Sequence, residues 1–304
     1  MPEGHSVHRI ARQFDLHFVG HEVAASSPQG RFAQGAQQLT GHTMVQSKAV
    51  GKQTFLEFDH GLWLRVHLGI YGAWDFAGDI TADATSADTV GRSMGAPRRA
   101  RLRMAEQERV VDEIEQFPPD PIGQVRVRLL TDATVADLRG PTACEVLTAE
   151  QVALAVGKLG PDPLVDDPKD GEERFVAAVG RRSTPIGLIL MDQSVVSGIG
   201  NVYRAELLFR AKLDPHTPGK LLAPELVRQL WRDWTHLLTI GVHTGLMLTM
   251  EGLDDVSQRK AVASREDRHW VYHREGLPCR VCGTNIAMEM AAARKLYWCP
   301  RCQA

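Results

Sequence analysis

The chain has 304 residues, of which 43% are hydrophobic and 24% are charged. A chain of this size and composition can bury a sizeable core and is long enough for two domains and a small module. Polar residues such as Glu3, His5 and Arg9 occupy the start, where a secretory signal would be apolar, and no run of about 18 apolar residues occurs. We therefore expect a soluble, cytoplasmic protein with no membrane partner.

The formal net charge of −2 at pH 7 is not the strongly basic balance of a typical nucleic-acid-binding domain. The charge is unevenly distributed, however, because residues 257–304 contain nine basic and four acidic side chains. That excess favours contact with phosphates, although a charge excess by itself usually marks only a solvated surface.

The N-terminal segment predicts a helix packed on a core. Apolar side chains recur at helical spacing, and Ser6 precedes them as an available N-cap. These apolar side chains are Val7, Ile10, Ala11, Phe14 and Phe18. From residue 23 to residue 76 the pattern changes to short alternating segments, such as 54–58 and 62–66, which Asp59-His60-Gly61 joins as a tight turn. We expect these segments to be antiparallel strands of a sandwich.

Residues 78–123 are rich in small and charged side chains and end in a proline cluster. This composition predicts a variable surface insertion that is partly disordered. Strands resume at residues 125–130 and are expected to close a first domain near Leu147.

Beyond Thr148 the pattern becomes helical, because a capping-box sequence at 148–151 begins a helix expected to reach Leu159. Further helices are expected over residues 185–192, 201–210 and 224–248. Gly198 and Gly200 precede one of them, and such glycines let backbone amides at a helix start approach an anion closely. The expected α+β organisation is an N-terminal β-sandwich domain over 1–147, a helical domain over 148–256 and a C-terminal module over 257–304.

The C-terminal module contains a cysteine pattern typical of a metal site. Two C-x-x-C pairs, separated by sixteen residues, comprise Cys279, Cys282, Cys299 and Cys302. Such spacing can surround a tetrahedral Zn²⁺ at about 2.3 Å from each sulfur. Four protein ligands leave no open position for a reacting water, so we expect one structural zinc ion. The remaining cysteine, Cys144, is expected to be an ordinary core thiol.

Pro2 carries a different kind of signal, because removal of Met1 would leave it with a secondary amine that can attack a carbon and form an iminium. An α-amino group with a pKa of about 7.9 is roughly 10% neutral at pH 7, whereas a lysine is almost wholly protonated. The positive end of the following helix further disfavours protonation, and Glu3 can move protons to and from a leaving group. Met-Pro-Glu is nevertheless a common start when taken alone.

Further polar residues have an ordinary structural interpretation beside a functional one. Lys52 follows Gly51 at a predicted hairpin tip, where most lysines simply face solvent. Asn201 begins a helix, and its ordinary structural role would be that of the helix cap. Arg294 and Lys295 lie between the cysteine pairs on a predicted hairpin, where the zinc module can hold a cation against a phosphate or leave it in solvent.

Several segments match one known family in its own order along the chain. They are Met1-Pro2-Glu3-Gly4, Gly51-Lys52, residues 159–164 (LGPDPL), residues 191–193 (MDQ), residues 198–204 (GIGNVYR) and residues 298–303 (WCPRCQ). On these segments the chain resembles the formamidopyrimidine-DNA glycosylase/endonuclease VIII family. The resemblance runs from residue 2 to residue 303, with only the insertion over 78–123 unmatched.

The resemblance implies an N-terminal β-sandwich flanked by helices, a helix-two-turns-helix domain and a four-cysteine zinc finger, with damaged DNA between the two halves. It also implies that a flipped nucleotide is attacked at C1′ by Pro2 and that the resulting Schiff base undergoes β- and then δ-elimination. Glu3 would be the general acid and base. Lys52, Asn201 and Arg294 would hold the phosphates around the flipped nucleotide, with Lys52 and Arg294 counted in the catalytic set. The protein would act on the nucleoid as a monomer.

The segment Leu68-Gly69-Ile70-Tyr71-Gly72 looks like the endonuclease VIII branch of that family, which favours oxidised pyrimidines. Ile70 and Tyr71 would fill the space left by the flipped base, although they can equally be ordinary strand residues. The formamidopyrimidine branch usually adds an Arg-Phe pair, and the segment at 138–141 has no phenylalanine. Gly187 also stands where that branch often has lysine. Oxidised pyrimidines are therefore favoured over 8-oxoguanine.

One departure concerns the first helix, where the family usually has a second acidic residue and this chain has His5-Ser6. Any role of that second carboxylate is therefore in doubt here. Three other functions compete with the expected one. They are an 8-oxoguanine glycosylase of the same fold, a catalytically silent DNA-binding protein, and a structural or ribosome-associated zinc protein. Pro2 and Glu3 are intact, which argues against the last two.

Overall fold

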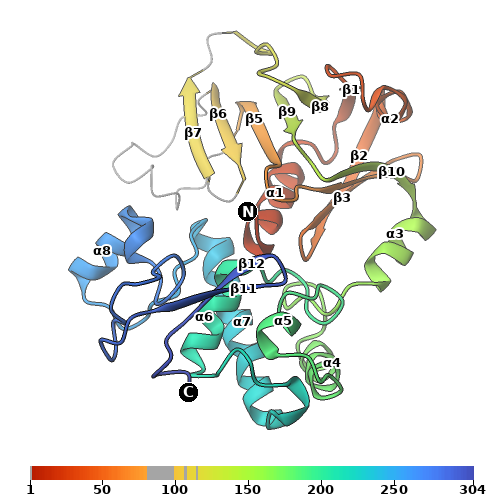
Figure 1. Ribbon diagram of the computed structural model, residues 1–304. Coiled ribbons are helices and arrows are strands. Elements are labelled where there is room, and N and C mark those ends of the chain that lie inside the picture. Colours follow the sequence, from red (N-terminus) through yellow and green to blue (C-terminus); the bar gives the residue numbers. More distant parts are fainter. Residues whose placement is uncertain (1, 81–98, 106–107, 114–115) are drawn as a thin grey trace. The chain divides into compact units, whose positions relative to one another are not determined.

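Figure 1 shows the computed structural model, which describes residues 2–80, 99–105, 108–113 and 116–304. The chain divides into two compact units, residues 1–158 and residues 159–304. Each unit has its own hydrophobic core. The three-part division at residues 147 and 256 stays a prediction.

The first unit is built on an antiparallel ladder with the order β10-β4-β3-β2-β1-β8-β9-β5-β6-β7. Its strands are β1 (Glu22–Ser26), β2 (His42–Val50), β3 (Gln53–Phe58), β4 (Leu62–His67), β5 (Ala73–Asp79), β6 (Arg99–Met104), β7 (Glu108–Glu113), β8 (Val125–Leu130), β9 (Thr134–Arg139) and β10 (Ala143–Thr148). Its helices are α1 (Gly4–His17), α2 (Ala33–Leu39) and α3 (Ala149–Gly157).

Strand β1 joins the two halves of this ladder. Val23 pairs with β2, whereas the next residues, from Ala24 on, pair with β8. Leu56 and Leu64 from one half share a buried cluster with Leu138 from the other half. Because both halves bury side chains in the same core, they form a sandwich, as the sequence predicted.

Helix α1 packs its apolar stripe into this core. Ile10, Phe14 and Phe18 have no exposed surface. The ring of Phe14 lies edge-on to that of Trp74, with centroids 4.8 Å apart, and 5.0 Å from that of Phe76. Aromatic pairs favour such edge-to-face packing, so the helix predicted near the N-terminus is confirmed and firmly positioned.

Three local predictions in this unit are wrong. Ser6 is not the N-cap of α1, because the helix begins at Gly4, Glu3 takes the cap position, and Ser6 lies within the first turn. Helix α2 interrupts the region predicted to contain only strands. Within the predicted insertion, residues 99–104 and 108–113 form β6 and β7, which extend the sheet beyond β5. Residues 81–98 of the insertion lie outside the described residues.

The start of the helical region agrees with its sequence pattern. The Thr148 side chain accepts a hydrogen bond from the backbone of Gln151, and the Gln151 side chain accepts one from the backbone of Thr148. This reciprocal capping box satisfies amides that the first turn of a helix leaves without partners. The predicted helix start is confirmed, and α3 ends at Gly157, two residues before the expected Leu159.

The second unit is mainly helical. Its elements are α4 (Pro168–Gly180), α5 (Ile186–Ile189), α6 (Asn201–Arg210), the 3-10 helix η2 (Gly219–Leu221), α7 (Pro224–Thr244), α8 (Asp255–Ala263), the 3-10 helix η3 (Arg265–Asp267), β11 (Ala287–Ala291) and β12 (Arg294–Trp298). Helix α6 has the predicted bounds. Helix α5 is shorter than predicted, and α7 ends earlier because Gly245 caps it in the left-handed conformation at φ 70°.

The connection before α6 is held by a single amide side chain. Gln193 donates through Nε2 to the carbonyl oxygens of Met191 and Ile199 and accepts through Oε1 from the backbone of Gly198. Because one side chain spans both ends of this loop, the start of α6 is held in place. Ser197 adds a 2.7 Å hydrogen bond to the carbonyl of Gly160, which ties the LGPDPL segment to the same loop.

Glu206 joins helix α6 to the segment that leads into the C-terminal module. Its side chain is fully buried and accepts hydrogen bonds from the backbone amides of Trp270, Val271 and Tyr272 at 2.7 to 2.9 Å. The Thr249 hydroxyl donates to it at 2.5 Å. A buried carboxylate needs such a set of donors to offset its lost hydration.

Glu206→Gln is therefore expected to lower the free energy of unfolding of the second unit by about 3 kcal/mol or more. The substitution turns an amide donor toward groups that are themselves donors. Urea denaturation followed by tryptophan fluorescence measures the loss. Glu225→Gln is the matched control, because Glu225 is exposed and its ion pair with Arg232 is 3.4 Å long, so it should cost less than about 1 kcal/mol. Equal losses in the two variants would disprove this role for Glu206.

Candidate functional site

Pro2 and Glu3 lie at the N-terminal end of α1. Glu3 is the N-cap residue, with φ −116° and ψ 178°, and only 1% of its surface is exposed. Pro2 is buried as well. The unpaired amides of a first helical turn carry partial positive charge, so the position disfavours a further positive charge. A proline amine here would be biased toward its neutral, nucleophilic form.

The start of α1 runs toward the turn between β2 and β3. Ser47 donates to the Ala11 carbonyl at 2.8 Å, and Val7 packs against Ala49. Four residues of a helix and two residues of a strand both span about 6 Å. The step from Ala11 back to Val7 in α1 therefore matches the step from Ser47 forward to Ala49 in β2, and the two elements run in opposite chain directions. One more such step places the Glu3 end of the helix beside the turn.

Lys52 occupies this turn, as the sequence predicted. Gly51 and Lys52 connect the paired residues Val50 and Gln53, and Gly51 has φ 59°, a conformation that favours glycine. Burial lowers the pKa of the His67 imidazole most, and the nearby charge of Lys52 lowers it further. The first unit therefore brings Pro2, Glu3 and Lys52 to one end of the sandwich.

His5 belongs to the His5-Ser6 pair that this chain has where the family usually has a pair ending in a second acidic residue. It is 1% exposed, and burial lowers its pKa to about 3, with smaller contributions from Arg9 and His8. The imidazole is therefore neutral at neutral pH. It cannot replace the charge of a carboxylate beside Glu3.

The low pKa of His5 predicts a loss of stability on acidification. The unfolded chain takes up the proton near pH 6.5 and the folded chain only near pH 3, so stability present above pH 6.5 falls as the pH is lowered. Between these two pH values, His5 alone should change the free energy of unfolding by about 1.4 kcal/mol per pH unit. Urea denaturation between pH 7.5 and 5 should give a shallower pH slope for His5→Gln than for the wild type. His21→Gln, at an exposed histidine of the same unit, is the control for the chemical change from histidine to glutamine.

Ile70 and Tyr71 lie in a turn between β4 and β5, so they are not strand residues. Ile70 is 55% exposed and Tyr71 85% exposed. The turn is closed by a 3.0 Å hydrogen bond from the Gly72 amide to the Leu68 carbonyl, and a Cβ at Gly72 would lie 2.2 Å from that oxygen. The glycine therefore permits a tight turn that presents two large apolar side chains to solvent.

In the second unit, Asn201 is the first residue of α6, and Gly200 is the cap, so Asn201 is not needed as an N-cap. Its Nδ2 donates to the Lys295 carbonyl at 2.9 Å. Arg204 donates to the Asn201 side-chain oxygen and, at 2.8 Å, to the same Lys295 carbonyl. The start of α6 is thus bonded to the backbone of strand β12.

Arg294 begins β12 directly after a two-residue turn, as the predicted hairpin required. Ala291 pairs with Arg294, and the turn residues Ala292 and Ala293 have φ 47° and 60°. Both are left-handed, which is the backbone of a type I′ turn and is costly for alanine. Arg294 and Lys295 therefore lie at the tip of a narrow hairpin, beside Asn201.

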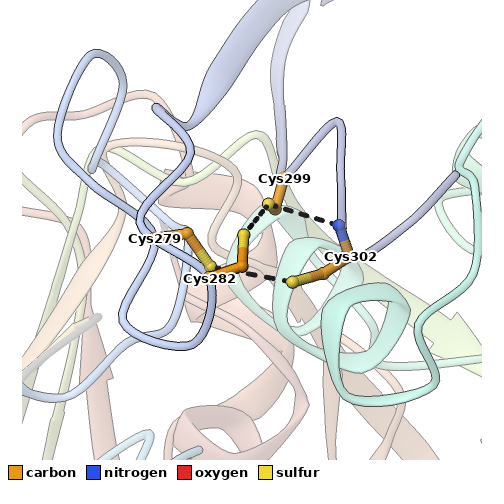
Figure 2. A group of neighbouring side chains, drawn as sticks. All are labelled: Cys279, Cys282, Cys299 and Cys302. Carbon is orange, nitrogen blue, oxygen red and sulfur yellow. Dashed lines mark hydrogen bonds between the residues drawn. The ribbon is translucent and has the colours of Figure 1, made fainter.

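The four predicted cysteine ligands come together in one cluster, as Figure 2 shows. The Sγ atoms lie within 4.8 Å of one another, with 3.5 Å between Cys282 and Cys299 and 4.0 Å between Cys279 and Cys302. A ZnS₄ tetrahedron with bonds of about 2.3 Å has edges of about 3.8 Å. The amide of Cys302 also donates to the Cys299 sulfur at 3.4 Å, which stabilises a thiolate. The residues therefore fit a zinc ion.

Another cluster of possible metal ligands among the described residues consists of His42, Asp59 and His60. The two imidazole rings are stacked with centroids 3.6 Å apart, and His42 is hydrogen-bonded to Asp59 at 2.8 Å. This cluster lies at the opposite end of β2 from Lys52, and its hydrogen bond already provides His42 and Asp59 with a partner at the surface. Among the described helices, none is both long and apolar enough to cross a membrane.

The sequence did not predict the structural roles of three residues, which are Arg204, Glu206 and His5. Arg204 belongs to the quoted GIGNVYR segment, so its position was visible, but its burial and its bonds to Asn201 were not. The roles of Pro2, Glu3, Lys52, Ile70, Tyr71, Asn201 and Arg294 toward DNA stay predictions.

Models of protein families match three successive parts of the chain. They are the formamidopyrimidine-DNA glycosylase N-terminal domain at residues 1–140, the formamidopyrimidine-DNA glycosylase H2TH domain at 159–251, and a zinc finger found in FPG and IleRS at 276–304. These matches confirm the predicted fold class, including the zinc finger.

Individual proteins agree with these models. Endonuclease 8 1 of Mycobacterium tuberculosis is 37% identical over 303 residues, which cover 100% of both chains. Formamidopyrimidine-DNA glycosylase of Thermus thermophilus is 35% identical over 149 residues, or 48% of this chain and 54% of that protein. The structure of Lactococcus lactis formamidopyrimidine-DNA glycosylase, bound to DNA with an AP site, covers 99% of both chains with a TM-score of 0.72. At 19% identity, that likeness concerns the fold alone.

Proposed function

We propose that this chain, which belongs to the formamidopyrimidine-DNA glycosylase/endonuclease VIII family of DNA glycosylases, excises oxidised bases through the amine of Pro2 and then cuts the strand. The observation that carries the proposal is the position of Pro2, immediately before a buried N-cap glutamate and next to the turn that bears Lys52. That arrangement is useful for chemistry only if Met1 is removed.

The proposed reaction begins when the Pro2 nitrogen attacks C1′ of a flipped deoxyribose. The bond from C1′ to the base breaks as the new C–N bond forms, and Glu3 transfers the proton that the amine loses to the departing base. Glu3 then protonates the ring oxygen O4′, so that the C1′–O4′ bond breaks and the opened sugar is left as an iminium. The resulting iminium withdraws electrons from the sugar, so its C2′ proton becomes acidic and the 3′ phosphate leaves by β-elimination. A second, δ-elimination releases the 5′ phosphate.

The remaining residues would bind and orient the DNA. Lys52 in the first unit, and Asn201 and Arg294 in the second, are proposed to hold phosphates around the flipped nucleotide. Ile70 and Tyr71, exposed on their tight turn, would fill the gap in the stack and offset the lost stacking energy. Zinc, held by the four cysteines as one structural ion, would support the hairpin that bears Arg294.

Oxidised pyrimidines are the proposed substrates. The match to a protein named endonuclease 8 over the full length of the chain supports this choice, as does the turn that bears Ile70 and Tyr71. A preference for 8-oxoguanine is the alternative, because half of the chain also matches formamidopyrimidine-DNA glycosylases at a similar identity. We further propose that the protein acts as a monomer on DNA in the cytoplasm, at the nucleoid.

The test is a panel of labelled duplexes that carry 5-hydroxyuracil, thymine glycol, 8-oxoguanine or an abasic site. Each is incubated with the zinc-loaded protein after mass spectrometry has verified loss of Met1, and borohydride is added to reduce any imine. Trapping on the pyrimidine lesions above 8-oxoguanine is expected, and the reverse order would select the alternative substrate. Absence of an adduct on all four duplexes would exclude the amine mechanism and leave a silent DNA-binding protein.

A further inference from the structure

We infer that Arg204 is a positioning residue that fixes Asn201 and the Arg294 hairpin as one phosphate-binding surface, an inference that rests on the proposed function. Arg204 itself is fully buried, with no exposed surface. It therefore cannot reach a phosphate directly. Any effect that it has on DNA must pass through the groups that it holds.

Two of the hydrogen bonds of Arg204 reach the two elements that carry the proposed DNA contacts, α6 and β12. One guanidinium nitrogen, Nη2, donates both to the side-chain oxygen of Asn201 and to the carbonyl of Lys295. The other, Nη1, donates at 3.3 Å to the carbonyl of Gly187 at the start of α5. A planar guanidinium can direct several donors at once, whereas a lysine offers one compact charge.

Asn201 closes the arrangement into a triangle. Its Oδ1 accepts from Arg204, which leaves its Nδ2 directed at the Lys295 carbonyl, 2.9 Å away. The orientation of the amide is thus fixed by the guanidinium. Lys295 directly follows Arg294, so its carbonyl anchors the residue that is proposed to bind phosphate.

The hairpin requires such an anchor because its own turn is unfavourable. Ala292 and Ala293 both adopt left-handed backbone, at a cost of roughly 1 kcal/mol or more for each residue. The side chain of Lys295 forms an exposed 3.3 Å ion pair with Glu275, and exposed pairs of this kind contribute little. The hydrogen bonds from the buried Arg204 and from Asn201 to the Lys295 carbonyl are therefore the firmer attachment of the hairpin tip to α6.

The decisive experiment compares Arg204→Ala with Arg268→Ala. Arg268 is also buried in the second unit and donates to the carbonyls of Ala261 and Val262, away from Asn201 and the hairpin. Both substitutions remove one buried positive charge and two or three hydrogen bonds to neutral oxygens. A difference in DNA binding between the two variants therefore reflects where the arginine lies, because the loss of charge and the general destabilisation are matched. Binding is measured below the melting temperature of both variants, on duplex DNA with a reduced abasic site.

Arg204→Ala is expected to weaken binding by about tenfold and to reduce the slope of log K against log salt by about one, the share of a single phosphate contact. A loss of folded protein would lower the active fraction without changing that slope. Arg268→Ala should keep the wild-type slope. In an Arg294→Ala background, Arg204→Ala should leave the slope unchanged, because the cationic contact that it positions is already gone.

Hydrogen exchange of free protein supplies a readout that does not depend on activity. Faster exchange of residues 294–296 in Arg204→Ala, but not in Arg268→Ala, is expected. If exchange and salt slope are the same in both variants while the wild type binds DNA, the inference is wrong and the proposed function stands. If the wild type binds no damaged DNA but exchange differs as expected, the anchor exists and the proposed function is wrong; if exchange does not differ either, both are wrong.

Discussion

Replacement of Pro2 by glycine is expected to lower the yield of borohydride-trapped adduct by about 100-fold or more on every lesion that the wild type processes. Glycine keeps a terminal amine but loses the ring that fixes its direction before α1. A misplaced nucleophile loses most of the benefit of a preorganised site. The yield is read as labelled DNA that migrates with the protein after denaturation, at equal concentrations of folded enzyme.

A second variant, with extra residues before Pro2, distinguishes the effect of the free amine from the effect of the proline ring. Extra residues before Pro2 keep the side chain but convert its nitrogen into an amide, which is not a nucleophile. This chain should form no adduct, while its melting temperature should match that of the processed protein. Pro28→Gly, in a turn of the same unit, controls for loss of a proline and should trap normally. If the extended chain still formed an adduct, another amine, such as that of Lys52, would be the nucleophile.

The fold was predictable where local patterns are strong. The stripe of α1, the turn at Asp59-His60-Gly61 and the bounds of α6 all follow from side-chain periodicity and glycine placement. Helix α2 was missed because only Ala36 and Leu39 of its seven residues are buried, which is too few to produce a visible period. Strand β6 was missed although Leu102 and Met104 alternate with arginines, because high charge made the segment resemble a solvated loop.

The candidate site was predictable only in its parts. The position of Lys52 after a glycine indicates a hairpin turn, and the spacing of the cysteines indicates a metal site. Arg204 and Glu206 could not be recognised in this way, because buried charges depend on partners far along the chain. The Lys295 carbonyl lies 91 residues from Arg204, and the amide of Trp270 lies 64 residues from Glu206. Arginine and glutamate are usually exposed, so composition alone favours the wrong answer for both.

Loss of zinc is expected to unfold the C-terminal module and to abolish binding of damaged DNA. The module packs around a small cluster that includes Ile286, Tyr297 and two of the ligands, Cys279 and Cys299. So few apolar residues cannot hold a fold by themselves. A structural zinc ion contributes about 10 kcal/mol or more to such modules. Cys279→Ser should therefore lower the zinc content measured by atomic absorption and expose the β11–β12 amides to rapid hydrogen exchange.

Cys144→Ser is the matched control, because it makes the same chemical change in the first unit. Burial raises the pKa of the Cys144 thiol to about 12, so this side chain is inert at neutral pH and distinct from the ligand set. The control should retain zinc and DNA binding. In Cys279→Ser, α1 and the sandwich core should keep their protection from hydrogen exchange, because that core is separate from the module. If Cys279→Ser instead bound zinc and DNA as the wild type does, the ion would not be what supports the Arg294 hairpin.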